Sequence, residues 1–499
     1  MPDNLFTRFL AAPSDLDRIF LRPSNGALSF RQTFALSAQL AHVLAAHGVK
    51  PGDRVAVQAE KSATALILYL ACLRIGAVYL PLNTGYTPGE LAYFIQDAAP
   101  RLFVCSDKNR QTIEAALPGI EILTISDDGG SGSLVTEASV APQTFPDAPV
   151  GMNDLASILY TSGTTGRSKG AMLSHGNLHS NAQSLIQAWA FSQADVLLHA
   201  LPIFHIHGLF VATNVSLLSA ASILLLPKFD PDAVFQALPE ATVMMGVPTF
   251  YTRLLKDDRL NRDITKHMRL FVSGSAPLLA ETHREWEQRT GHALLERYGM
   301  TETNMNTSNP YRGARIPGSV GLPLPGVELR IADSDGNPVA SGEIGMIEIR
   351  GPNVFQGYWN MPEKTAAEFR KDGFFITGDL GMIGPDGYVR IVGRGKDLII
   401  TGGLNVYPSE VESLLDAIPG VEEAAVVGLP HEDFGEGVTA FLVTKPGAQL
   451  TETGVLEALR DRLARFKQPK RVIFVKQLPR NTMGKVQKSA LREEYAKLY

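Results

Sequence analysis

The chain has 499 residues, of which 45% are hydrophobic and 19% are charged, and its formal net charge is −5. These values exclude a disordered chain and leave enough apolar sequence for more than one domain core. A slightly acidic chain also lacks the basic field that nucleic-acid binding requires, so we expect no nucleic-acid partner.

The two cysteines and the N-terminus indicate the compartment. Cys72 and Cys105 both lie in apolar runs (LACLRI and LFVCS), which predicts buried thiols in a reducing environment. The opening sequence MPDNLFTRFL lacks the apolar core and the cleavage site of a signal peptide. We therefore expect a cytoplasmic protein.

The first 125 residues alternate between predicted helices and strands. Helices are expected over residues 30–48 and 62–76, and a third helix follows a capping box formed by Thr87 and Glu90. The predicted strands cover residues 53–58, 77–82 and 101–106. This alternation is typical of parallel or mixed sheets covered by helices. Residues 126–148, rich in Gly, Ser, Asp and Pro, are expected to be a surface connection.

Residues 208–226 form a run of 19 residues without a charge, close to the length of a membrane span. The run contains Thr213, Asn214 and Ser216 and ends in a strand-like ILLLP. We therefore predict a buried helix followed by a strand, and no membrane span.

The sequence pattern changes near residue 325. Short predicted strands separated by Gly and Asp there indicate an antiparallel, β-barrel-like region. Beyond residue 393 the pattern is that of a small α+β domain, whose first helix is expected to start at a capping box of Ser409 and Glu412. We therefore expect an α/β protein with a large N-terminal domain, residues 1–393, and a small C-terminal domain, residues 394–499.

The strongest motif is YTSGTTGRSKG, residues 160–170, between an apolar strand and a second strand that leads to a helix capped by Ser174. Glycines let backbone N–H groups approach phosphate oxygens, the hydroxyl side chains add donors, and Lys169 adds a positive charge. The spacing is not that of a Walker A loop. The motif nevertheless predicts a phosphate-binding loop.

This loop resembles that of the adenylate-forming enzymes, the superfamily of acyl-CoA synthetases, peptide-synthetase adenylation domains and luciferases. The other motifs of that superfamily follow in order: YGMTET (298–303), TGD (377–379), GRGKDLIITGGLNVYP (393–408) and PRNTMGK (479–485). The resemblance extends over about residues 25 to 490. It implies a large domain that holds ATP and the acyl substrate, and a mobile small domain.

The resemblance assigns nucleotide roles to residues of these motifs. The implied ATP-binding residues are Thr161, Ser162, Gly163, Thr164, Thr165, Gly166, Lys169, Tyr298, Gly299, Met300, Asp379 and Arg394. Tyr298 offers a ring for adenine and, before its Gly-Met-Thr-Glu turn, is expected to be exposed at a strand end. Glu302, with Thr165, suits Mg²⁺, and Thr301 is placed to touch the α-phosphate. Asp379 and Arg394 are the ribose ligands.

The reaction implied by the resemblance has two steps. A carboxylate attacks the α-phosphorus of ATP, releasing pyrophosphate and leaving an acyl-adenylate, while Lys485 neutralises charge in the transition state. The small domain then rotates about Lys396 and presents Gly402, Gly403 and Leu404 to coenzyme A. Because loss of the Lys485 charge would stop adenylation, that lysine is a candidate substrate of a lysine acetyltransferase and deacetylase.

The acyl pocket of the superfamily is lined by three segments, here residues 202–210, 247–255 and 273–278, which a fatty-acyl enzyme would keep apolar. Here the candidate substrate-binding residues are His205, Arg253, Ser275, Arg284 and Met305. An arginine that faces such a pocket indicates a substrate with a second carboxylate. The constellation resembles the malonyl-CoA synthetases, with His205 acting in catalysis and bounding a short pocket with Met305.

The predicted activity is therefore ATP-dependent ligation of a small dicarboxylic acid, malonate or also methylmalonate, to coenzyme A. Ile206 stands where some relatives carry Thr, which leaves methylmalonate open. Alternatives are a short- or medium-chain or aryl acid–CoA ligase, an adenylation enzyme that loads a carrier protein, and a catalytically silent nucleotide-binding protein. The carrier-protein alternative predicts an acidic partner for a substrate amine in PIFHIHGLF, which contains none.

Overall fold

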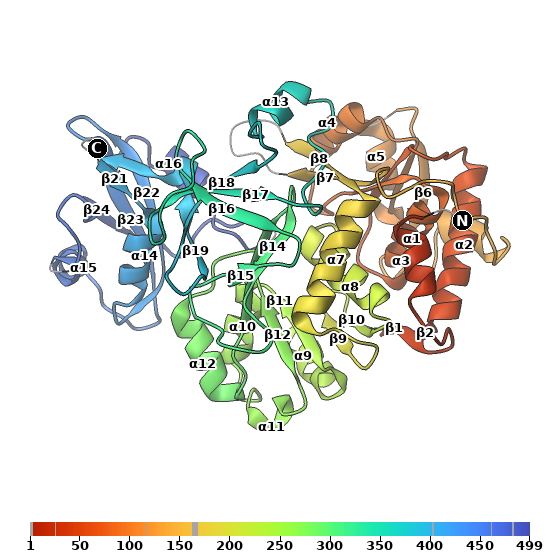
Figure 1. Ribbon diagram of the computed structural model, residues 1–499, viewed down its shortest axis with the longest axis horizontal. Helices are drawn as coiled ribbons and strands as arrows, with labels where there is room; N and C mark the ends of the chain where they lie inside the picture. The colour runs from red at the N-terminus through yellow and green to blue at the C-terminus, as the bar shows by residue number, and fades with distance from the viewer. Residues whose placement is uncertain are drawn as a thin grey trace. The chain divides into compact units, whose positions relative to one another are not determined.

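The structure is a computed structural model that describes residues 3–24, 26–116, 118–161, 168–401, 404–460, 462–481 and 484–499. The chain divides into two compact units. The large unit comprises Met1–Pro317, Gly321–Glu328 and Ile349–Phe375, and the small unit comprises Gly318–Val320, Leu329–Glu348 and Ile376–Tyr499 (Figure 1). The boundary expected at residue 393 stays a prediction about where the mobile domain begins.

The large unit contains a six-stranded sheet whose strands are parallel except for the last pair, β7 and β8. In spatial order the strands are β6 (Glu121–Ile125), β5 (Leu102–Ser106), β3 (Arg54–Gln58), β4 (Val78–Pro81), β7 (Leu155–Thr161) and β8 (Lys169–Ser174). The antiparallel turn-back from β7 to β8 brings the two ends of the phosphate loop together.

A second, nine-stranded sheet completes the large unit. Its spatial order is β15 (Leu322–Pro323), β14 (Asn304–Ser308), β13 (Leu295–Met300), β12 (Leu270–Ser273), β11 (Val243–Gly246), β9 (Val196–His199), β10 (Ser222–Leu225), β1 (Ile19–Pro23) and β2 (Leu28–Ser29). Strands β9 to β13 are parallel to one another, so their carboxyl ends meet at one edge.

Helices accompany both sheets of the large unit (Figure 1). They are α1 (Leu5–Ala11), α2 (Phe30–Ala46), α3 (Ala63–Ile75), α4 (Pro88–Ala98), α5 (Arg110–Ala116), α6 (Ser133–Ser139), α7 (His175–Trp189), α8 (Thr213–Leu218), α9 (Pro231–Ala237), α10 (Pro248–Leu255), α11 (Arg262–Thr265), α12 (Ala280–Thr290) and α13 (Pro362–Ala367). Short 3₁₀ turns cover Asp107–Asn109 and Leu238–Glu240, and a π-helix covers His207–Ala212.

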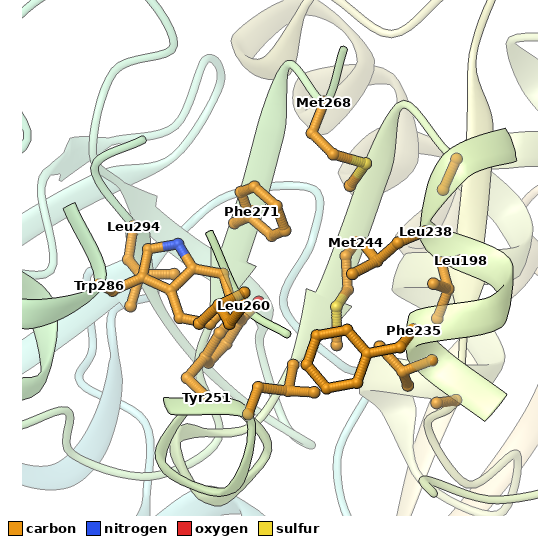
Figure 2. Packing of buried hydrophobic residues seen from close by; sticks show 14 of the residues in the cluster. Leu198, Phe235, Leu238, Met244, Tyr251, Leu260, Met268, Phe271, Trp286 and Leu294 are labelled. Atoms are coloured by element: carbon orange, nitrogen blue, oxygen red, sulfur yellow. The ribbon is translucent and has the colours of Figure 1, made fainter. Parts of the chain in front are cut away.

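Figure 2 shows the apolar core beside β11 and β12 of the nine-stranded sheet. Trp286 of α12 packs edge-on against Phe271 and Tyr251, and the Tyr251 hydroxyl donates to the Val272 carbonyl at 2.6 Å. This packing fixes the end of β12, where the chain runs on into Ser273 and Ser275 of the predicted acyl segment.

The short strands predicted beyond residue 325 are confirmed, and they form a four-stranded sheet that belongs mostly to the small unit. In order, the strands are β16 (Glu328–Ala332), β17 (Gly345–Arg350), β18 (Phe375–Ile383) and β19 (Val389–Arg394). The rest of the small unit is built from a 3₁₀ turn (Gly395–Asp397), β20 (Ile399–Thr401), β21 (Leu404–Val406), α14 (Pro408–Asp416), β22 (Val421–His431), β23 (Gly435–Thr444), α15 (Glu452–Leu459), β24 (Arg471–Phe474) and α16 (Lys488–Glu494).

The prediction for residues 208–226 is confirmed, since the buried π-helix and α8 are followed by strand β10. No helix of the described part of the chain combines the length and the apolar character that crossing a bilayer requires. The surface connection predicted at residues 126–148 is wrong in part. It contains α6, whose Leu134 is fully buried and supplies an apolar anchor.

The predicted capping box of Ser409 and Glu412 is also wrong. Tyr407 occupies the N-cap position of α14 without a side-chain cap, and the Ser409 hydroxyl donates to the Val392 carbonyl. Glu412 accepts a hydrogen bond from the Val426 amide at 2.7 Å. The Ser409 and Glu412 side chains therefore form hydrogen bonds with residues outside the helix and do not cap its N-terminus.

The cap predicted at Ser174 is present and carries a stability prediction. Its hydroxyl accepts from the Asn177 amide at 3.0 Å, and the Asn177 side chain accepts from the Ser174 amide at 2.9 Å. We expect Ser174→Ala to lower the free energy of unfolding by about 1 kcal/mol in a urea titration, because α7 loses a donor–acceptor pair at its N-terminus. Ser180→Ala, within the same helix, is the control; an equal loss there would contradict the capping argument.

Candidate active site

The phosphate loop joins β7 to β8. Its residues Ser162, Gly163, Thr164, Thr165 and Gly166 lie outside the described residues, so their predicted roles remain predictions. The two flanking positions are described: Thr161 pairs with Lys169 across the strands, and the Thr161 hydroxyl donates to the Lys169 carbonyl at 3.4 Å. The strand register therefore places Lys169 directly opposite Thr161, on the strand that follows the loop.

The Lys169 ammonium has two partners among the described residues of the large unit. Its Nζ lies 3.1 Å from Oε1 of Glu368 and 4.0 Å from the centre of the Tyr358 ring. A carboxylate and an aromatic face both favour a cation, so Lys169 is held between them. Neither Tyr358 nor Glu368 was predicted as a site residue.

Glu302 lies in the tight turn between β13 and β14 and is buried. Its Oε1 is 3.0 Å from the Tyr358 hydroxyl, which is also 2.6 Å from Oε2 of Glu368. Burial, followed by the charges of the two carboxylates, raises the pKa of the Tyr358 hydroxyl, which stays protonated at neutral pH. The described residues contain no cluster of three or more His, Cys, Asp or Glu side chains that could enclose a metal ion. One buried carboxylate, linked through Tyr358 and Glu368 to Lys169, does fit Mg²⁺ held jointly with substrate phosphates.

The rest of the YGMTET motif surrounds this turn. Tyr298 lies within β13, two residues before its last residue Met300, and its side chain is buried, with 7% exposed, so the predicted solvent exposure is wrong. Gly299, Met300 and Thr301 are half-buried. A methyl group on Gly299 would meet the carbonyl of Asn304 and the side chain of Met305, so the bulge between β13 and β14 requires glycine there.

Four polar residues form a hydrogen-bonded chain, and three of them belong to the predicted acyl segments. His205 Nδ1 accepts from the His207 amide at 3.4 Å, His207 Nδ1 lies 3.3 Å from Ser275 Oγ, and an Arg297 terminal nitrogen donates to the same Ser275 Oγ at 3.3 Å. Ser275 has a φ of +72°, a strained conformation for a residue with a side chain. Met305 is fully buried one strand away, on β14.

Arg297 is 4% exposed, and no described carboxylate forms an ion pair with it. Its Nε and the Nε2 of the fully buried His207 have no hydrogen-bond partner among the described residues. Burial lowers the pKa of the Arg297 guanidinium to about 9, so it remains charged at neutral pH. Burial and the nearby Arg297 charge lower the pKa of His207, which is neutral. A buried cation without an anionic partner is costly unless a ligand supplies the anion.

The two arginines predicted to bind the substrate lie elsewhere on the large unit. Arg253 on α10 and Arg284 on α12 both have exposed side chains. The structure does not join either of them to the chain of His205, His207, Ser275 and Arg297, and their substrate roles stay predictions. The sequence did contain a signal for Arg297: it stands with Glu296 inside the buried strand LERYGM.

In the small unit, Asp379 and Arg394 face each other across β18 and β19, and their side chains form an ion pair of 2.6 Å. Lys396 follows in a 3₁₀ turn, and burial lowers the pKa of its ammonium. Lys485 is exposed, and its amide donates to the Asn481 side chain at 2.9 Å. Leu404 is an exposed apolar residue of β21, whereas Gly402 and Gly403 lie outside the described residues.

Comparisons with known proteins agree with these motifs. The AMP-binding enzyme family matches residues 10–359, and the AMP-binding enzyme C-terminal domain matches residues 410–485. The solved structure of ATP-bound MatB from Rhodopseudomonas palustris is 58% identical, covers 100% of both chains and has a TM-score of 0.98.

Relatives with named activities are similar over most of the chain. A malonate–CoA ligase of Arabidopsis thaliana is 37% identical over 484 residues, covering 89% of this chain and 78% of the relative. A feruloyl-CoA synthase of Amycolatopsis sp is 36% identical over 479 residues, covering 95% of each chain. With the family match spanning both the phosphate loop and the C-terminal lysine, this chain belongs to the AMP-binding enzymes of the adenylate-forming superfamily.

Proposed function

We propose that the protein is an AMP-forming malonate–CoA ligase. Malonate and ATP give malonyl-adenylate and pyrophosphate, and the thiol of coenzyme A then displaces AMP to give malonyl-CoA. The similarity to MatB and to a malonate–CoA ligase supports this assignment. The relatives also include a feruloyl-CoA synthase, so similarity alone leaves the acid open.

The observation that selects malonate is the buried Arg297 guanidinium. A feruloyl or other aryl group would leave this cation without a counter-ion, whereas the distal carboxylate of malonate would neutralise it. Ser275 and His207 add polar groups at the same place. We assign to these three residues the carboxylate that does not react, while His205 and Met305 bound the pocket.

The remaining roles follow the motifs. Lys169 binds the phosphates that become pyrophosphate, and Asp379 with Arg394 binds the ribose. Glu302 would hold Mg²⁺, which supplies charge neutralisation between the phosphates. Lys485 supplies a positive charge where the attacking carboxylate meets the α-phosphate. Rotation about Lys396, a cytoplasmic location and acetylation of Lys485 are further parts of this proposal.

Pyrophosphate release from a panel of acids tests the proposal. We expect malonate to give a kcat/KM at least about 10²-fold above those of propionate, octanoate and ferulate, because only malonate neutralises the buried guanidinium. Methylmalonate in the same panel measures the tolerance for an α-methyl group. A preference for ferulate or octanoate over malonate would refute the dicarboxylate assignment, and turnover with no acid would favour a silent nucleotide-binding protein.

A further inference from the structure

We propose that Glu368 is a positioning residue. It forms an ion pair with the Lys169 ammonium before the nucleotide binds, and it releases that ammonium to the phosphates of the bound nucleotide. The Tyr358 hydroxyl links this exchange to Glu302. The inference rests on the proposed role of Lys169 in binding the nucleotide phosphates, and it does not depend on which acid the enzyme uses.

The carboxylate of Glu368 has three donors. Lys169 and Lys364 both approach Oε1, at 3.1 and 2.9 Å, and the Tyr358 hydroxyl approaches Oε2 at 2.6 Å. The Lys169 and Glu368 side chains are only 18% and 20% exposed, so water screens this ion pair less than it screens one on the open surface. Lys169 therefore has a defined position before any phosphate arrives.

Phosphate binding must compete with that position, because one ammonium cannot be fully paired with both Glu368 and a triphosphate. Glu368 loses little stabilisation in this exchange. Lys364, one helical turn before it, and Tyr358 both remain as partners when Lys169 leaves. The arrangement thus keeps the carboxylate satisfied in both states, which is what a reversible holder of Lys169 requires.

Tyr358 extends the exchange to Glu302. Its hydroxyl has a single hydrogen but lies within hydrogen-bond distance of both Glu302 and Glu368. When Lys169 leaves, Glu368 loses a positive partner and attracts that hydrogen more strongly. The hydrogen is then withdrawn from Glu302, whose carboxylate gains capacity for another ligand. Release of Lys169 from Glu368 therefore makes the Glu302 carboxylate more available to another ligand.

Equilibrium binding of pyrophosphate and ATP to Glu368→Gln, measured by calorimetry with and without MgCl₂, tests the proposal. Glutamine keeps the shape and an acceptor for Tyr358 but no longer retains Lys169. We expect pyrophosphate to bind about three- to tenfold more tightly, with or without MgCl₂. Lys364→Met should weaken pyrophosphate binding, because Glu368 then depends more on Lys169.

The double variant Lys169→Met/Glu368→Gln separates the exchange from simple charge removal. We expect Glu368→Gln to give no gain in pyrophosphate affinity in the Lys169→Met background. An equal gain there would mean that Glu368 only repels phosphate, and unchanged or weaker binding in the single variant would mean that it only supports the fold. Either result overturns the proposal. Because no acid is present, the assignment of malonate can fail without affecting this outcome.

Discussion

Arg297→Met is expected to lower kcat/KM for malonate by about 10²- to 10³-fold, because under the proposed function the distal carboxylate loses its buried charged partner. The same variant should use propionate at least as well as the original enzyme does. It should also be no less stable, because methionine removes a buried charge that has no counter-ion among the described residues. Pyrophosphate release with the two acids and the midpoint of thermal unfolding measure these effects.

Arg253→Met and Arg284→Met are the matched controls, since both side chains are exposed. We expect each to change the malonate to propionate ratio much less than Arg297→Met does. If Arg284→Met instead abolished the preference and Arg297→Met unfolded the protein, the carboxylate site would belong to Arg284. Arg297 would then be a structural residue.

Lys485→Ala is expected to reduce malonyl-adenylate formation by about 10²- to 10³-fold or more, because the transition state loses a positive charge. Thioester formation from supplied malonyl-adenylate should continue at nearly the original rate, since the second step needs no charge at that position. The lysine is exposed, so we expect little change in stability. Pyrophosphate release and malonyl-CoA production from the adenylate measure the two steps separately.

Lys476→Ala, also exposed in the small unit, controls for general loss of positive charge and should leave both steps unchanged. Equal losses in both steps for Lys485→Ala would contradict the assignment of Lys485 to adenylation alone.

Much of the fold could be predicted because its signals are local. The Thr87 and Ser174 caps are both present, and the uncharged run after residue 208 folds as expected. The predictions failed where contacts with residues distant in the sequence determine the local structure. Glu412 could have capped its own helix, but the Val426 amide and the Lys488 ammonium, at 2.7 and 2.6 Å, take its carboxylate. Leu134 gives residues 126–148 an apolar anchor that their polar composition conceals.

The site residues likewise include some that could be predicted from the sequence and others that could not. Motif residues such as Asp379 and Arg394 could be named from the sequence, and the strand register then pairs them. The burial of Arg297, and the lack of a counter-ion for it among the described residues, are properties of the packed structure, so the sequence alone could not single it out beside Arg253 and Arg284. Glu368 is an ordinary helix-end acid in the sequence. Only the folded chain brings it to Lys169.

The backbone beside the guanidinium has a consequence for how substrate range could evolve. A methyl group on Gly274 would lie 2.5 Å from the Nε and Cζ of Arg297, so alanine at that position cannot coexist with the present placement of the arginine. One small substitution, directly before Ser275, would therefore force the guanidinium to move from its present position. Under the proposed function, a descendant of this scaffold could in this way weaken its preference for a diacid while keeping the arginine codon itself intact.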